Sequence, residues 1–150
     1  YDEFAIKELV QKVMMHTVIS VGADLAQCYL ETNKGTSDRY LKNKNPGMCK
    51  YTDSYVALLK EANIDVKMDP DIARDGGYFC TFPTVWEGWK ARKIKLSNPR
   101  YDEAKKLAAK NKIFDSLQAL EDAGYAGDDK LYAEKIYGIY KREKFDRFDQ

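Results

Sequence analysis

Apolar side chains recur every two to four residues along most of this chain, which is the spacing of one helix face. A first helix is predicted for residues 3–16, and its apolar face contains Phe4, Ile6, Leu9, Val10, Val13 and Met14. A second is predicted for residues 22–33, with Asp24 in its first turn and Gly35 just beyond its end. After Thr84 the pattern returns, and further helices are predicted at residues 84–96, 98–110, 113–124 and 128–143. Most of the chain is therefore predicted to be helical.

The middle of the chain breaks this pattern. Residues 33–47 are polar and are predicted as a loop, whereas residues 53–62 are predicted as a helix. Residues 63–77 indicate a loop with one short strand at most, and residues 77–82 have the aromatic and β-branched content of a strand. The predicted fold class is α+β, mostly helical with a small β lobe or irregular insertion around residues 43–83. A cleft between the helical body and this insertion is the default place for a ligand.

Length and charge narrow the class of protein. At 150 residues the chain is about one domain long, and because it begins without Met we expect a single domain from a longer protein with flanking modules. Its 25 Lys and Arg against 24 Asp and Glu argue against nucleic acid or an anionic membrane as the main partner. No apolar run approaches the roughly 18 residues that a membrane span needs, and no leader is visible. The 11 tyrosines suit a core or a surface that contacts sugar rings.

The three cysteines match no metal-binding pattern. Cys28 lies in an apolar helical stretch, where a small buried thiol is expected. Cys49 and Cys80 flank the insertion, and the sequence leaves open whether they form a disulfide or remain thiols.

Glu31 is the residue with the most specific chemical signal. No metal cluster, phosphate loop or catalytic triad is visible, so carboxylates are the plausible catalytic groups. At the end of a helix, the negative end of the dipole and the neighbours Tyr29 and Leu30 both favour a raised pKa for Glu31. A carboxyl that keeps its proton is what a general acid needs to protonate a glycosidic oxygen. By spacing alone, however, a solvated surface glutamate is the commoner outcome.

The sequence around Glu31 resembles a known family. "AQCYLETNKGTS", residues 26–37, is similar to the A-Q-x-x-L-E-S and G-W-G motifs of the β-N-acetylglucosaminidases of glycoside hydrolase family 73. This family includes flagellar peptidoglycan hydrolases, autolysins and phage lysins. Later matches follow in the family's order, namely "NKNPGMCK", "FCTFPTVWEGW", "NPRY" and "LEDAGYAGDDKLYAEKI". The resemblance covers nearly the whole chain.

The resemblance implies a fold, an activity and a setting. The fold would be lysozyme-like, with a groove between a helical lobe and a small β lobe. The activity would be cleavage of the β-1,4 bond on the reducing side of N-acetylglucosamine in bacterial peptidoglycan, with Glu31 as the catalytic acid and with no metal or organic cofactor. The expected location is extracellular, in the cell wall, or associated with a virion or phage lysis.

The resemblance also implies substrate contacts. Tyr132 matches the tyrosine that lines the family's site, and Tyr125, Tyr51, Gln27 and Asn45 are further candidates for binding substrate. Trp86, Trp89 and Phe82 could also stack on sugar faces. The i, i+3 spacing of Trp86 and Trp89 in a helix after Pro83 favours the core for these two.

Two departures from the family's pattern bear on the site. Asn33-Lys34-Gly35 stands where the family has G-W-G, and one extra residue separates Asp128 from Tyr132. A second carboxylate is expected some dozen residues before the strand at Phe79.

This second carboxylate is predicted to be Asp65, with Asp69 and Asp71 as alternatives. Its role stays open between a general base, a nucleophile and a group that orients the substrate's own N-acetyl oxygen. Rival functions are a lytic transglycosylase or muramidase on the same fold, and an inactive wall-binding or virion structural module.

Overall fold

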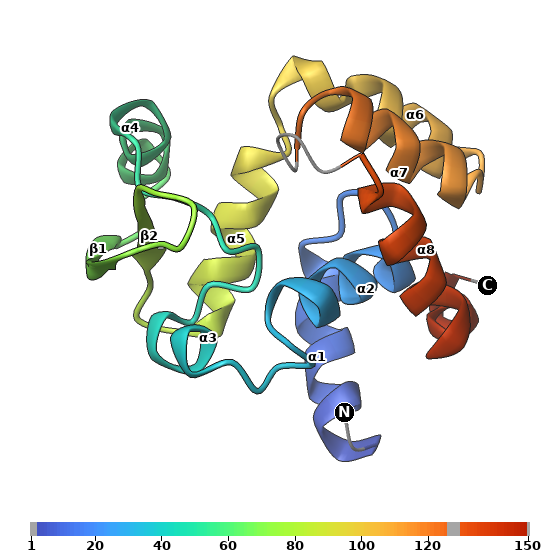
Figure 1. The fold of residues 1–150 in the computed structure, drawn as a ribbon, viewed down its shortest axis with the longest axis horizontal. Coiled ribbons are helices and arrows are strands. Elements are labelled where there is room, and N and C mark those ends of the chain that lie inside the picture. The colour runs from blue at the N-terminus through green and yellow to red at the C-terminus, as the bar shows by residue number, and fades with distance from the viewer. Residues whose placement is uncertain (1–2, 126–129, 150) are drawn as a thin grey trace.

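A computed structural model describes residues 3–125 and 130–149, which form helices around one small sheet (Figure 1). The elements are α1 (Glu3–Met15), α2 (Val21–Glu31), α3 (Asp38–Asn43), α4 (Asp53–Glu61), β1 (Lys67–Ile72), β2 (Tyr78–Thr81), α5 (Val85–Lys95), η1 (Pro99–Tyr101), α6 (Asp102–Ala109), α7 (Ile113–Asp122), α8 (Tyr132–Arg142) and η2 (Phe145–Asp149). The predicted α+β class is confirmed. Within the described residues, no helix is both long and apolar enough to cross a membrane.

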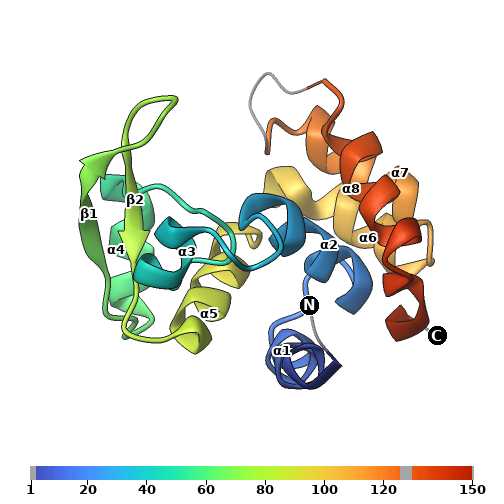
Figure 2. The same cartoon turned by 60° about the horizontal axis from the view of Figure 1, so that its bottom comes forward.

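The elements form two lobes joined by α5 (Figure 2). The larger lobe contains α1, α2, α6, α7 and α8, and the smaller contains α3, α4 and the β1–β2 hairpin. Each lobe has its own apolar core. Helix α5 contributes to both, because Trp89 packs in the large core and Ala91 in the small one. This sharing ties the two lobes together along one helix.

Helix α2 lies at the centre of the large lobe. Every residue from 22 to 29 is buried, so the sides of this helix pack against its neighbours. Ser20 caps its first turn by accepting a hydrogen bond from the Ala23 amide. Asp149, at the other end of the chain, accepts hydrogen bonds from the Gly22 amide (3.0 Å) and the Ser20 hydroxyl (2.8 Å). A carboxylate at this positive helix end stabilises α2, which carries Glu31 at its opposite end.

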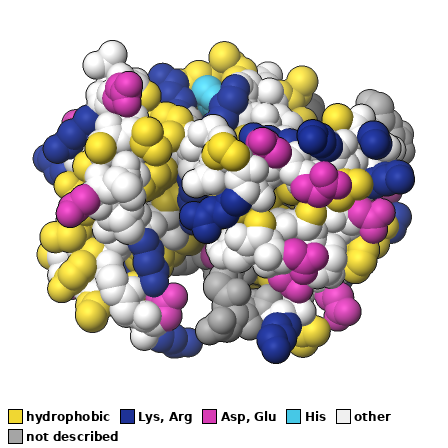
Figure 3. Space-filling view, turned by 90° about the horizontal axis from the view of Figure 1, so that it is seen from above, with side chains coloured by type: hydrophobic (Ala, Val, Ile, Leu, Met, Phe, Trp, Pro, Cys, Tyr) yellow, Lys and Arg dark blue, Asp and Glu magenta, His cyan; other side chains and the backbone are white. Residues whose placement is uncertain are grey.

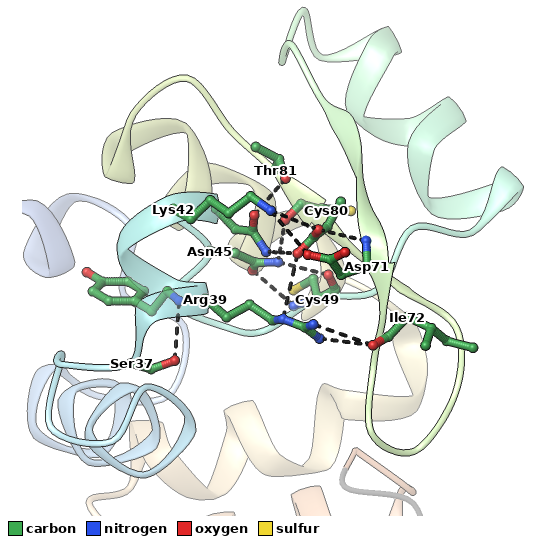
Figure 4. A network of polar contacts seen from close by, with 12 residues as sticks. Ser37, Arg39, Lys42, Asn45, Cys49, Asp71, Ile72, Cys80 and Thr81 are labelled. Atoms are coloured by element: carbon green, nitrogen blue, oxygen red, sulfur yellow. Dashed lines mark hydrogen bonds and ion pairs between the residues drawn. The ribbon is translucent and has the colours of Figure 1, made fainter.

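The small lobe is held together by α3 and the antiparallel hairpin. Lys67 pairs with Thr81 and Met68 with Cys80, and the register shifts before Ile72 pairs with Tyr78. Figure 4 shows Arg39 of α3 reaching the Ile72 carbonyl (3.4 Å).

Buried Asp69 of β1 is the centre of the polar network between α3 and the hairpin. It accepts hydrogen bonds from Asn43 (2.7 Å) and Lys42 (3.3 Å) and lies near Arg39. The position of the hairpin therefore depends on α3.

Most predicted elements are confirmed, and α3 is an exception. Helix α3 lies within the stretch predicted as a loop; Ser37 caps its N-terminus, but Asn43 is its one buried residue, so no apolar stripe announces it. Cys49 and Cys80 are buried thiols and form no disulfide. Their backbones lie side by side, since the Cys80 amide donates to the Cys49 carbonyl (2.9 Å), and burial raises the pKa of the Cys80 thiol to about 12. The first two residues predicted for the last helix, 128 and 129, lie outside the described residues.

Candidate active site

A cleft of about 1170 Å³ lies between the two lobes. Its large-lobe side includes Glu31 at the end of α2 and Tyr132 at the start of α8. Its small-lobe side includes Asp75 and Phe79 from the hairpin. The cleft thus lies at the predicted place, and Glu31 lines it.

Tyr132 contacts the Glu31 carboxyl. The ring is 2% exposed, and its hydroxyl donates a hydrogen bond to Glu31 Oε1 over 3.3 Å. Burial, together with nearby Tyr125 and Glu31, raises the pKa of Tyr132 well above its ordinary value. The phenol therefore stays neutral and remains a hydrogen-bond donor.

A buried polar chain lies behind Tyr132. Gln27 donates from Nε2 to the Tyr132 hydroxyl (3.1 Å), and its Oε1 accepts a hydrogen bond from Arg92. Arg92 in turn forms an ion pair with Asp24 over 2.8 Å, and both side chains are at most 1% exposed. The chain runs Asp24, Arg92, Gln27, Tyr132, Glu31, and it connects the core of α2 and α5 to the cleft.

Arg92 belongs to this series of hydrogen bonds, and the sequence motifs do not indicate it. Its position offers a signal, since it follows Trp89 by three residues and precedes Leu96 by four, and both are fully buried. A cation on that face of α5 requires a buried anion, because an unpaired charge in a core is strongly unfavourable.

The turn after Glu31 has an unusual backbone. Asn33 (φ 48°), Lys34 (φ 61°) and Gly35 (φ 77°) all adopt left-handed conformations, which favour glycine. Buried Thr32 fastens the turn, since its hydroxyl donates to the Cys28 carbonyl (2.6 Å) and accepts from the Gly35 amide (2.9 Å). This geometry is a physical reason for glycines in the G-W-G motif, and here Asn33 adopts it where the motif has its first glycine.

Tyr125 and Lys95 form the floor next to Tyr132. The Lys95 ammonium lies 4.6 Å from the centre of the Tyr125 ring, a cation–π contact, and the rings of Tyr125 and Tyr132 are 5.8 Å apart. Burial lowers the pKa of Lys95, but the acidic groups around it, Cys49 first and Glu31 among them, outweigh burial and raise it. Lys95 is therefore cationic at neutral pH. The Tyr125 hydroxyl is buried and has no hydrogen-bond partner among the described residues.

Asp75 is the carboxylate on the opposite wall. It lies in the turn between β1 and β2, next to Gly76 and Gly77, whose positive φ values allow the tight turn. Its side chain is 75% exposed and forms an ion pair with Lys50 over 2.8 Å. The hydrogen bond from Lys50 lowers the pKa of Asp75. Asp75 is therefore an anion on the wall that faces Glu31.

None of the three aspartates predicted as the second acid lines this cleft. Asp65 is exposed between α4 and β1. Asp69 is 1% exposed and bound by α3, and Asp71 is exposed and pairs with Lys42 over 3.5 Å. The next aspartate, Asp75, lines the cleft instead, because it lies in the turn between β1 and β2 rather than on β1.

The other predicted contacts divide between the cleft and the core. Tyr132 and Tyr125 line the cleft. Gln27 is 1% exposed and lies behind Tyr132, and Asn45 is buried, where it donates to the Cys49 and Cys80 carbonyls. Tyr51 packs against the small core.

The other large aromatic side chains of this region lie apart from the cleft lining. Trp89 is buried, as predicted, and Phe82 is buried as well. Trp86 is half-buried with its ring centre 4.8 Å from that of His16.

The family model described as mannosyl-glycoprotein endo-β-N-acetylglucosaminidase, the glucosaminidase family, matches residues 7–145. The chain belongs to the glucosaminidase family. It is accordingly a glycoside hydrolase of the endo-β-N-acetylglucosaminidase kind, and the activity class that the motifs predict is confirmed. The match spans both lobes and therefore the whole cleft.

Solved domains of an autolysin and of a glycoside hydrolase share the fold. A C-terminally truncated glycoside hydrolase domain of Salmonella typhimurium FlgJ is 21% identical with a TM-score of 0.66, covering 93% of this chain and 95% of its own. The catalytic domain of the autolysin Auto from Listeria monocytogenes is 19% identical with a TM-score of 0.59, covering 95% and 82%. A search of curated protein sequences found no match. The lysozyme-like architecture expected from the motifs is thus confirmed.

Proposed function

We propose that this chain hydrolyses the β-1,4 bond on the reducing side of N-acetylglucosamine in bacterial peptidoglycan, with Glu31 as the general acid. The observation that carries the proposal is the Glu31 carboxyl, which ends α2 inside the cleft and accepts a hydrogen bond from Tyr132. The similarity to an autolysin catalytic domain supports peptidoglycan as the polymer. The proposed place of action is the cell wall, reached as part of a longer autolysin or phage lysis protein.

Glu31 donates its proton to the glycosidic oxygen as the bond breaks. Tyr132 keeps the carboxyl in one orientation during this transfer, because its hydroxyl is bound on one side by Gln27 and on the other by Glu31. A buried and neutral phenol suits this task, since it holds the carboxyl without competing for the proton.

Asp75 replaces Asp65 as the proposed second carboxylate. Its ion pair with Lys50 keeps it ionised, as required of a group that holds water, attacks the sugar or orients the N-acetyl oxygen. Phe79 and Tyr125 line the same cleft and offer ring faces against which a sugar can stack.

The first test replaces the proposed acid without changing its shape. Glu31→Gln removes the titrating proton, and we expect a loss of wall-clearing activity of at least about 100-fold, the lower range of a general acid's contribution. Glu61→Gln is the matched control, because Glu61 ends α4 as Glu31 ends α2 but is exposed outside the cleft. Equal activity of Glu31→Gln and wild type would remove Glu31 from the mechanism.

The second test identifies the bond that is cut. Mass spectrometry of a digest of defined peptidoglycan separates the candidate reactions. Reducing-end N-acetylglucosamine supports the proposal, reducing-end muramic acid indicates a muramidase, and anhydromuramic ends indicate a lytic transglycosylase. Wall binding without new reducing ends would indicate an inactive binding or structural module.

A further inference from the structure

A second hollow of about 440 Å³ adjoins the cleft, between α4 and the end of α5 with η1. Lys50 and Lys95 line both hollows, so the two meet at these side chains. Beyond them, the second hollow is lined by apolar groups such as Leu58, Ile94 and Tyr101. Arg100, at the start of the large lobe, lines it too. A ligand in the cleft therefore has a side pocket beside it.

The charges around the two hollows differ from those of the whole chain, whose net charge is only +1. The cationic residues that line them are Arg39, Lys50, Arg74, Lys95, Arg100 and Lys135. The described acidic residues that line them are Glu31 and Asp75, and both belong to the cleft. Lysine and arginine side chains also border the hollowed middle of the face shown in Figure 3. A neutral sugar chain alone does not require this excess of positive charge.

Two cations of the second hollow have their charge available for a ligand. Lys50 is paired with Asp75, but Lys95 and Arg100 form no ion pair within the part of the chain that the structure describes. Each lies instead against an aromatic ring, Lys95 over Tyr125 and Arg100 over Tyr101 at 5.4 Å. Such contacts hold the cations in place without neutralising them.

We propose that this second hollow binds the anionic peptide stem of the muramic acid residue next to the cleaved bond. The inference rests on the proposed function, because the sugar on the reducing side of N-acetylglucosamine carries this peptide. The stem has to leave the cleft sideways, and the hollow borders the cleft at Lys50 and Lys95. Its mixture of cations with Leu58, Ile94 and Tyr101 matches a short peptide that carries both methyl groups and carboxylates. A wall polyphosphate offers fewer apolar groups that could contact this part of the lining.

The experiment compares two substrates, glycan strands with their stems and the same strands stripped of stems by an amidase. For wild type we expect kcat/KM to be higher on stem-bearing strands. Arg100→Glu should lower the ratio of the two kcat/KM values by about two- to fivefold, the size expected for a partly exposed charge pair. Arg100 is exposed, so this variant is expected to fold. Lys106→Glu is the matched control, because Lys106 is an exposed residue of α6 that lines neither hollow. The ratio of the two kcat/KM values for this variant should equal that of wild type.

Binding of the stem by itself gives a second readout. A synthetic stem tetrapeptide should bind the Glu31→Gln protein more tightly than the same peptide with all its carboxylates amidated. Arg100→Glu should remove this difference in affinity. A wild-type ratio of one, a ratio unchanged by Arg100→Glu, or binding of poly(glycerol phosphate) but not of the stem peptide would overturn the inference. Failure of the proposed function looks different, since then neither kind of strand is cleaved, or the digest carries reducing-end muramic acid or anhydromuramic ends instead of reducing-end N-acetylglucosamine.

Discussion

The Tyr132 hydroxyl has its only proton directed at Glu31, over 3.3 Å, because its oxygen already accepts a hydrogen bond from Gln27 over 3.1 Å. This direction originates at Arg92, which has donors only and therefore faces Gln27 Oε1. The Gln27 amide must then turn its NH₂ group toward Tyr132. The ion pair with Asp24 holds Arg92 in place, so every hydrogen bond up to Glu31 has a defined direction.

Tyr132→Phe removes one hydroxyl and keeps the ring. The Glu31 carboxyl loses the donor that orients it, so kcat should fall about ten- to hundredfold, while KM changes less than about twofold. Steady-state kinetics on soluble glycan oligomers measure both. Tyr137→Phe on the same helix is the control, because its ring contacts with Phe114 and Tyr140 survive and it lies outside the cleft. A Tyr132→Phe enzyme with the kcat of wild type contradicts the assignment.

Gln27→Leu tests whether Gln27 acts through Tyr132. The variant should lower kcat to a similar degree as Tyr132→Phe, because Tyr132 is then free to turn its proton elsewhere. The double variant Gln27→Leu/Tyr132→Phe should be no slower than Tyr132→Phe, since residues in one hydrogen-bond chain are not additive. Additive losses in the double-mutant cycle would assign Gln27 an independent role.

The buried ion pair predicts an asymmetric effect on stability. Arg92→Met removes the cation that compensates the charge of buried Asp24 and should lower the free energy of unfolding by about 3–5 kcal/mol. Adding Asp24→Asn removes that charge but keeps an acceptor for the Val18 amide (3.0 Å), so the double variant should be more stable than Arg92→Met alone. Urea denaturation followed by circular dichroism measures both. A double variant that is less stable than the single one would argue against an uncompensated charge.

Asp75→Asn tests the second carboxylate. We expect kcat to fall about 100-fold, since the amide neither holds a water as base nor attacks the sugar. The denaturation midpoint should stay at the wild-type value because Asp75 is 75% exposed. Asp71→Asn is the control, an exposed hairpin aspartate outside the cleft. If both variants keep full activity, the second acid is a different residue or the substrate's own N-acetyl group.

Asp69 predicts how stability depends on pH. Burial favours its neutral form, but hydrogen bonds from Asn43, the Asp71 amide and Lys42 outweigh burial and lower its pKa. A carboxyl whose pKa is lower in the folded state stabilises the fold above its unfolded pKa of about 3.9, and this contribution is lost as the pH falls below it. Asp69→Asn should therefore lower the free energy of unfolding at pH 7 by about 1–3 kcal/mol, with a smaller difference from wild type at pH 3. Denaturation at the two pH values measures this, and an equal difference at both would contradict it.

The predictable part of the fold is the part in which local pattern and burial agree. Helices α2, α5 and α7 pack an apolar face and are predicted within a few residues of their bounds. Helix α3 is missed because polar contacts to β1 hold it, and no periodic apolar face marks it. The motifs predict Glu31 and Tyr132 as site residues, and they predict Gln27 as a substrate contact, whereas the structure shows it bound to Tyr132.

The sequence by itself determined the family, the helical pattern and the glutamate at the end of α2, because motifs and periodicity are local properties of the chain. The tertiary structure alone decided the partners of that glutamate. Arg92 joins Gln27 across 65 residues, and the packing of the hairpin places Asp75 of its turn at the cleft. Both depend on how separate elements pack, since the direction of a buried side chain is set by the neighbours that satisfy its charge and hydrogen bonds.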